Sequence, residues 1–362
     1  MPVPLIKRAL DAFATEGVDP SASSFFSRSG RFLLLSDSRS DAEPNIELFV
    51  EFPEGSENTP KNLDLNISLG VKNDVLFEGA FRTRASVDNE LLTPTGKWEI
   101  VCEDFDSKRA FCEIVAPLER GRRFSRRFLF AYRESLLLVF DELDDDKSKR
   151  KDNSLLSLRE TFPLTRGIDV LQDDEAREIT FSREKNSENR DDAKTVFATK
   201  KSNRLSEEDA FIESLYSEEP TEKESLVNIA KVFPLDLPEW RCDKSRGELL
   251  VNKRSLKLEL SGNRRGRTLV SSLLIDVCPQ RAARFCTWKP LSVGEGGINV
   301  DEDAALGRKI QLGKEQFVLY ASTSERPKVR SVISRNLISE FMFGKFLVKR
   351  GVDPIVDVEI ES

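Results

Sequence analysis

Four arginines lie within six residues of one segment, and their chemistry suits the recognition of anions. They are Arg122, Arg123, Arg126 and Arg127. A guanidinium group stays charged and forms paired hydrogen bonds with carboxylate, sulfate or phosphate groups. The segment alternates apolar and polar residues, which predicts a β-strand. Arg123 and Arg127 then share one face of the strand. Arg122 and Arg126 share the opposite face with Phe124.

Two interpretations of this cluster are open. In the first, Arg123 and Arg127 form a fork that binds an anionic ligand. In the second, the cluster lies at a sheet edge or a strand end and is paired with nearby acidic side chains.

A second basic segment lies between two predicted strands, Leu256–Leu260 and Thr268–Ile275. Its sequence is Gly262-Asn-Arg-Arg-Gly-Arg267. Asparagine and glycine tolerate the positive φ values of a hairpin turn. We therefore expect Arg264, Arg265 and Arg267 at the tip of a loop, where they form either an anion-binding site or a solvated turn.

The chain contains no histidine. Histidine is the commonest metal ligand and the usual partner of a serine or cysteine nucleophile. Zinc sites built on histidine and Ser-His-Asp triads are therefore excluded in this chain. The five cysteines include no C-x-x-C pair, so we expect neither a metal site nor a cofactor.

Two catalytic chemistries need no histidine. A pair of carboxylates can cleave a glycosidic bond, and a tyrosine can act as an acid or base. The candidate residues are Glu99 with Glu113, Asp301 with Asp303, Tyr132, Tyr216 and Tyr320.

Alternation with a period of two residues dominates the sequence from about residue 30 onward, in segments spaced like the strands of sandwiches and barrels. This pattern predicts an all-β protein: a large antiparallel β-sandwich of the supersandwich type, with close to twenty strands. The 24 phenylalanines suit a thick core between sheets. Helices are predicted only at Pro4–Glu16 and Leu205–Tyr216. We expect an N-terminal helix in residues 1–20, a first β lobe in 21–150 and a second in 151–362, the two lobes forming one continuous sandwich.

Cys102 and Cys112 flank a predicted hairpin whose turn lies near residues 106–108. In the simplest register the two thiols share one face of the hairpin. They are then either reduced core residues or a cross-strand disulfide.

The charge balance argues against nucleic acid as a partner. The chain has 56 lysine and arginine residues against 63 acidic residues, a net charge of −7, whereas a nucleic-acid surface is broadly basic. Nowhere do 18 uncharged apolar residues follow one another, and the first residues lack a signal-peptide core. We therefore expect a cytoplasmic protein that does not enter a membrane.

The segment from Arg122 to Leu143 combines an arginine-bearing strand, a short turn and an apolar strand that ends at Asp141. It resembles the β-sandwich region of heparinase II/III-like polysaccharide lyases. The upstream segment Thr93-Pro-Thr-Gly-Lys-Trp98, which leads into a predicted strand, also resembles that region. In that family an α/α-toroid domain precedes the sandwich and supplies most of the catalytic tyrosine and histidine. Neither the toroid nor a histidine is found in this chain, so the resemblance implies a many-stranded sandwich and no active-site residue.

We therefore expect a non-catalytic β-sandwich protein that binds an anionic glycan or a protein partner, through residues among Arg123, Arg127, Arg264, Arg265 and Arg267. The alternatives are a polysaccharide-active lyase or hydrolase, and a scaffold for assembly.

Overall fold

The structure of this protein is a computed structural model. It describes residues 25–28, 31–35, 46–52, 62–71, 74–106, 108–145, 154–184, 226–278, 281, 286–323, 329–333, 335–347 and 351–358. This part contains 26 β-strands and one short 3₁₀ helix, η1 (Glu119–Gly121). All strand pairs are antiparallel, so the predicted all-β antiparallel architecture is confirmed. The two predicted helices, Pro4–Glu16 and Leu205–Tyr216, lie outside the described residues.

Two large sheets form the centre of the molecule. The nine-stranded sheet contains, in order, β1 (Phe25–Arg28), β2 (Arg31–Leu35), β3 (Ile46–Glu51), β4 (Leu65–Val71), β5 (Asp74–Val87), β11 (Leu155–Pro163), β16 (Lys257–Arg265) and β15 (Gly247–Asn252), with β6 (Glu90–Leu91) beside β5. The eight-stranded sheet contains, in order, β12 (Asp169–Gln172), β13 (Ile179–Glu184), β14 (Leu226–Pro234), β17 (Thr268–Asp276), β10 (Leu136–Asp145), β9 (Arg122–Ala131), β8 (Arg109–Pro117) and β7 (Glu99–Phe105). Strands from before and after residue 150 pair in both sheets, as β5 with β11 and β10 with β17.

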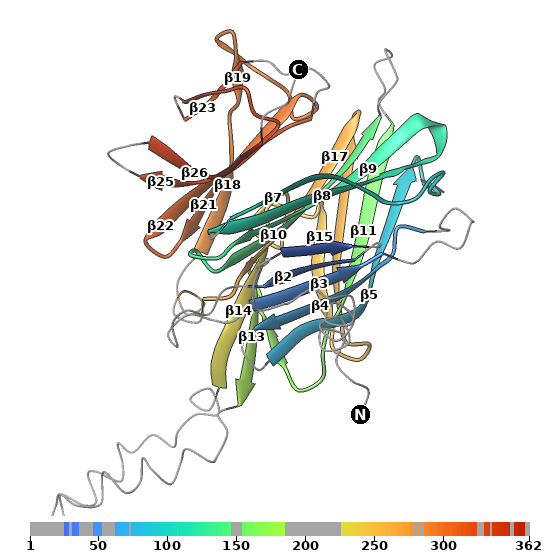
Figure 1. Ribbon diagram of the computed structural model, residues 1–362, viewed down its shortest axis with the longest axis vertical. Helices are drawn as coiled ribbons and strands as arrows, with labels where there is room; N and C mark the ends of the chain where they lie inside the picture. Colours follow the sequence, from blue (N-terminus) through green and yellow to red (C-terminus); the bar gives the residue numbers. More distant parts are fainter. Residues whose placement is uncertain are drawn as a thin grey trace, which may run out of the picture.

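Two smaller sheets come from the last third of the chain (Figure 1). The five-stranded sheet contains β18 (Cys286–Leu291), β21 (Ala305–Leu312), β22 (Glu315–Ser322), β25 (Phe341–Leu347) and β26 (Gly351–Val358). The four-stranded sheet contains β20 (Ile298–Asn299), β19 (Gly294–Glu295), β23 (Arg330–Val332) and β24 (Arg335–Leu337).

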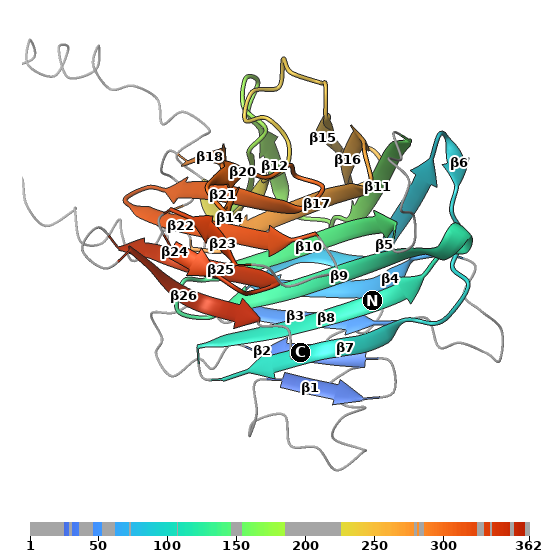
Figure 2. The ribbon, with the colours of Figure 1, turned by 90° about the horizontal axis from the view of Figure 1, so that it is seen from above.

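The sheets stack as layers (Figure 2). A hydrophobic core fills each space between them. Between the nine- and eight-stranded sheets, the rings of Phe32 and Phe128 meet at 5.3 Å between centroids. Between the eight- and five-stranded sheets, Phe111 and Phe341 lie 5.5 Å apart. The third core packs residues such as Tyr320 between the five- and four-stranded sheets. The eight-stranded sheet is therefore covered on both faces over β8, β9 and β10.

The hairpin formed by β7 and β8 has its turn at the predicted place, where the amide of Asp106 bonds to the carbonyl of Arg109 at 2.9 Å. The prediction that Cys102 and Cys112 share a face was wrong. A β-bulge shifts the register between Ile100 and Cys102, and one extra residue reverses the facing of every side chain beyond it. Cys112 consequently lies in the first core while Cys102 packs against the second, and both thiols are free.

The outer face of the nine-stranded sheet is polar over β5, β11, β16 and β15. Along β5 and β11, buried and exposed residues alternate from Phe81 to Val87 and from Leu156 to Phe162. This alternation is expected when one face packs on a core and the other meets solvent. Within the described residues, no helix is long and apolar enough to cross a bilayer.

Candidate anion-binding surface

The first predicted arginine site is divided by the layered fold. Arg123 is exposed on β9, opposite Asp144 in the neighbouring strand β10. Arg127 lies on the same face of β9 but only 4% of it is exposed, because the five-stranded sheet covers that part of the strand. The predicted assignment of arginines to faces therefore agrees with the fold, but the two side chains do not form an open fork.

Acidic side chains from the neighbouring strands pair with Arg127. Its Nη2 lies 3.0 Å from an oxygen of Glu113, and its Nη1 donates to Glu142 at 2.9 Å. Burial opposes the charge of Arg127, but the two carboxylates more than compensate and raise its pKa above the ordinary value. Burial also raises the pKa of Glu142, and Arg127 limits that rise. This is a buried ionic cluster with no access for a ligand.

Arg126 faces the opposite core and is fully buried. Its Nε donates to Asp141 at 2.7 Å, and its Nη2 donates to Thr83 at 2.8 Å and to Glu160 at 3.2 Å. The hydroxyl of Ser271 donates to the other oxygen of Glu160 at 2.6 Å. Burial and the adjacent Asp141 raise the pKa of Glu160 well above its ordinary value of 4.5. Side chains of three strands, β5 and β11 of one sheet and β10 of the other, thus contact one guanidinium group.

The second predicted site already holds two carboxylates of the chain itself. Strand β16 extends to Arg265, so the turn is limited to Gly266 and the residue after it, and is tighter than the sequence predicts. Arg264 lies 2.7 Å from Asp301 and 3.1 Å from Asp303. A Cβ atom at Gly266 would lie 2.7 Å from the carboxylate of Asp303, which explains the need for glycine there.

The backbone of the same turn also binds Asp303. The amides of Arg267 and Thr268 both donate to Asp303 Oδ1 at 3.2 Å. The side chains of Arg265 and Arg267 are exposed. The turn therefore has the chemistry of an anion site, and Asp303 occupies it.

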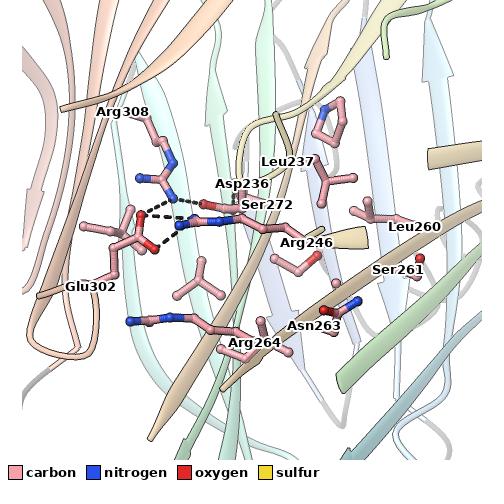
Figure 3. A pocket seen from close by; sticks show the side chains of 16 residues that line it. Asp236, Leu237, Arg246, Leu260, Ser261, Asn263, Arg264, Ser272, Glu302 and Arg308 are labelled. Atoms are coloured by element: carbon pink, nitrogen blue, oxygen red, sulfur yellow. Dashed lines mark hydrogen bonds and ion pairs between the residues drawn. The ribbon is translucent and has the colours of Figure 1, made fainter. Parts of the chain in front are cut away.

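A pocket beside Arg264 lies where β16, β17 and β21 approach one another (Figure 3). Arg308 pairs with Asp236 at 2.9 Å and with Glu302 at 3.2 Å, and Arg246 reaches the same glutamate at 2.9 Å. The free space is about 30 Å³, which is enough for one or two water molecules. The positive charges here are neutralised within the chain.

Three arginines on the outer face of the nine-stranded sheet form no ion pair with the residues that the structure describes. Arg82 and Arg84 are exposed on β5, and Arg159 is exposed on β11. Arg84 and Arg159 are directly opposite in the register, and Arg82 lies on the diagonal, opposite Thr161. Directly opposite Cβ atoms are about 5 Å apart in an antiparallel sheet. We refer to Arg82, Arg84 and Arg159 as the arginine triad.

Two carboxylates lie near the triad, that of Asp64 and that of Glu259, which is opposite Thr161 on the same face. The charges of Arg82 and Arg84 act on Asp64, whose pKa burial raises and these arginines partly lower. Asp64 accepts a hydrogen bond from the amide of Thr83 at 3.3 Å. Across the described ranges, no ion pair joins a triad side chain to this or any other carboxylate. Like charges placed directly opposite on a sheet are destabilising, so an anion bound between Arg84 and Arg159 would relieve their repulsion.

Hydroxyl groups surround the triad on the same face. Ser86 lies opposite Ser157 on β5 and β11, and Thr161 lies between Arg82 and Glu259. Ser261 is the neighbour of Arg159 on β16. This combination of guanidinium and hydroxyl groups suits a ligand that carries both anionic groups and hydroxyls.

Sequence reasoning missed the triad. The signal available was the alternation Phe81-Arg-Thr-Arg-Ala85, which places two arginines on one face of a strand. No feature of that segment points to Arg159, because the residues become neighbours only when β5 pairs with β11 in the folded sheet.

The residues considered above for carboxylate or tyrosine catalysis do not come together in one site. Glu99 is exposed on the edge strand β7, while its partner Glu113 is buried in the pair with Arg127. Tyr320 is fully buried in the third core and Tyr132 packs beside Phe130. The predicted Tyr216 lies outside the described residues, and Asp301 and Asp303 bind Arg264 as described above.

Comparisons with known proteins find similarity in structure only. No family model matches the sequence, and no curated protein matches it. The heparan sulfate lyase HepC from Pedobacter heparinus is similar over 88% of this chain, with a TM-score of 0.49 and 11% identity. The heparinase III BT4657 gene product is similar over 87%, with a TM-score of 0.48 and 11% identity. The chain spans 46% and 45% of the length of these two proteins. The resemblance to heparinase II/III-like lyases drawn from the sequence is thus confirmed as a structural similarity.

Proposed function

We propose that this protein is a non-catalytic β-sandwich module that binds an anionic glycan through the arginine triad. The observation that carries this proposal is the local excess of positive charge at Arg82, Arg84 and Arg159 on an exposed sheet face. In the other arginine clusters discussed above, Arg127, Arg264 and Arg308 are paired with carboxylates of the chain. Since exposed like charges are unfavourable without a counter-ion, the triad is the best candidate for an external anion.

The surroundings of the triad favour a glycan over a nucleic acid. Three arginines amid hydroxyl groups match a ligand with sparse sulfate or carboxylate groups and many hydroxyls. A nucleic acid requires a longer basic surface, and this chain has a net charge of −7. An acidic protein segment is the alternative occupant, and competition experiments distinguish it.

The test is calorimetric titration of the protein with heparin, with hyaluronan, which carries carboxylates but no sulfates, and with neutral dextran. Duplex DNA and an acidic peptide serve as competitors. We expect saturable binding of an anionic glycan, and at least about a tenfold loss of affinity in R84A/R159A, because each substitution removes a charge-assisted contact.

A matched control is R133A/R166A, which removes the same charge from two exposed turn arginines. This variant should bind within about twofold of the wild type, since it leaves the triad intact. Equal losses in the two variants would show that binding depends only on net charge. Binding of DNA or the peptide in preference to every glycan would refute the assignment of the ligand.

A further inference from the structure

An open groove of about 600 Å³ lies beside the hairpin that joins β15 and β16. This volume is within the range of ligand-binding pockets. The lining residues are Gln172, Asp174, Arg241, Leu250, Val251, Asn252, Lys253, Arg254 and Glu259. We call this feature the hairpin groove.

The charged groups of the hairpin groove are not neutralised by one another. Arg241, Lys253 and Arg254 are positive, and Asp174 and Glu259 are negative. Within the described part of the chain, none of these five takes part in an ion pair. Arg241 donates instead to the carbonyl of residue 173 at 2.9 Å. The groove therefore offers both unpaired donors and unpaired acceptors.

Buried and partly buried hydrogen bonds hold the walls of the groove. Arg177 is only 1% exposed, and it donates to the carbonyls of Trp240 at 2.7 Å and Gly247 at 3.2 Å, which shapes the loop that carries Arg241. Gln172 donates to the carbonyl of Leu249 at 2.8 Å and so joins the edges of the two large sheets. The groove is thus preorganised.

A hydrogen bond and the backbone conformation also fix the shape of the hairpin that carries Lys253 and Arg254. The amide of Ser255 donates to the side chain of Asn252 at 3.1 Å, and Leu256 adopts a positive φ of 49°. Lys253 and Arg254 are exposed at this turn. Because they lie outside both strands, their side chains can be shortened without loss of a core contact.

The groove and the arginine triad share one face of the nine-stranded sheet. In the register, Leu250 lies opposite Glu259, Glu259 opposite Thr161, and Thr161 opposite Arg82. Side chains in such a cross-strand row point to the same side of the sheet. Three strand spacings separate the ends of the row, a distance of about 14 Å. One extended ligand can reach both.

We infer that the hairpin groove is a second subsite, which takes the sugar units next to those bound at the arginine triad; this rests on the proposed function. Lys253 and Arg254 bind sulfate or carboxylate groups of the glycan. Asp174 and Glu259 accept hydrogen bonds from its hydroxyls. Leu250, which is 42% exposed, contacts the apolar face of a sugar ring.

The two carboxylates define the class of ligand. In a site for a densely charged polyanion, Asp174 and Glu259 would repel the ligand. In a site for a polyhydroxylated chain they are useful acceptors. The groove therefore fits a glycan with intermittent charges better than a nucleic acid.

The first experiment uses size-defined oligosaccharides of hyaluronan and of sparsely sulfated heparan sulfate in calorimetric titrations. For the wild type, affinity should rise with length once a fragment spans about 14 Å, the distance between the two subsites. In K253A/R254A, short fragments should bind as in the wild type, and the gain with length should fall about tenfold. R133A/R166A is again the control and should keep the full gain.

The second experiment neutralises the acceptors with D174N/E259Q. The inference predicts about a threefold or greater loss of affinity for long fragments, because amides accept hydrogen bonds less strongly than carboxylates. Tighter binding would identify simple charge attraction and overturn the inference.

The outcomes separate the two proposals. Failure of every fragment to bind the wild type refutes the proposed function and the subsite with it. Binding whose length dependence is unchanged in K253A/R254A refutes the subsite alone. A uniform loss at every length would also refute it, since a second subsite acts only on ligands long enough to reach it.

Discussion

The buried network around Arg126 predicts that its two carboxylates respond very differently to neutralisation. Asp141 and Glu160 both contact the Arg126 guanidinium, and all three residues are at most 2% exposed. In this buried site the single positive charge of Arg126 can compensate only one negative charge. Arg126 contacts Asp141 through two nitrogens and Glu160 through one, and burial together with Asp141 raises the pKa of Glu160 well above 4.5. We therefore predict that Glu160 is the carboxyl that keeps a proton at pH 7.

The magnitudes follow from that assignment. E160Q replaces a neutral acid with a neutral amide, and should change the free energy of unfolding at pH 7 by less than about 1 kcal/mol. D141N removes the carboxylate that Arg126 binds through two nitrogens, and Glu160, 3.2 Å from the guanidinium, must lose its proton to replace it. The cost should therefore exceed that of E160Q but lie below the about 3 to 5 kcal/mol of a buried charge left unpaired. The guanidinium also stacks at 3.9 Å on the ring of Phe81, which keeps Arg126 in place while its partner is lost.

The pH dependence has a definite sign. A carboxyl with a raised pKa binds its proton more tightly in the folded state than in the unfolded chain. The stability contributed by the proton on Glu160 is complete below the unfolded pKa near 4.5, and is lost as the pH rises through the folded value. Between the two values this contribution falls by about 1.4 kcal/mol per pH unit. E160Q should remove that part of the decline.

The assay is urea unfolding followed by circular dichroism at several pH values between 5 and 9, for the wild type, E160Q and D141N. The expected result is a larger loss in D141N than in E160Q, little loss in E160Q at pH 7, and a flatter pH profile in E160Q. Equal destabilisation by the two variants would show that both carboxyls are ionised, and would refute the reasoning.

Two other predictions concern the backbone and the thiols. Gly247 has a φ of 134°, and a Cβ atom there would lie 1.9 Å from the carbonyl oxygen of Ser261; G247A should therefore cost more than about 1 kcal/mol in urea unfolding, and an unchanged midpoint would contradict the close approach. Burial raises the pKa of the Cys112 thiol, whereas Cys242 is exposed. With a thiol reagent at pH 8, Cys242 should react first and Cys112 only on unfolding, as peptide mapping would show; early labelling of Cys112 would place it outside the core.

Local patterns predicted much of the fold. The alternation in β9 correctly assigned Phe124 and Arg126 to one face and Arg127 to the other. The hairpin of β7 and β8 was also predicted, because its turn is flanked by two alternating segments. The facing of Cys102 was not, since a β-bulge leaves no clear mark in the sequence and reverses every side chain beyond it.

The functional surface was harder to predict than the fold. The sequence left open whether Arg264 belongs to an anion-binding site or to a solvated turn, and in the structure Arg264 and the turn backbone bind Asp303 of the same chain. The sequence around Arg159 did not indicate a role for it, because its neighbour Arg84 is far away in sequence and only the pairing of β5 with β11 brings the two together.

The sequence by itself determined the all-β class, the faces of a regular strand such as β9 and the absence of imidazole chemistry, because these depend on residue type and on a two-residue period. Only the tertiary structure decided which arginines are available to a ligand. Stacking a third sheet on the eight-stranded one buries Arg127 with Glu113 and Glu142. The outer face of the nine-stranded sheet leaves Arg84 and Arg159 exposed and opposed. Charge compensation depends on neighbours in space, and long-range strand pairing sets those neighbours.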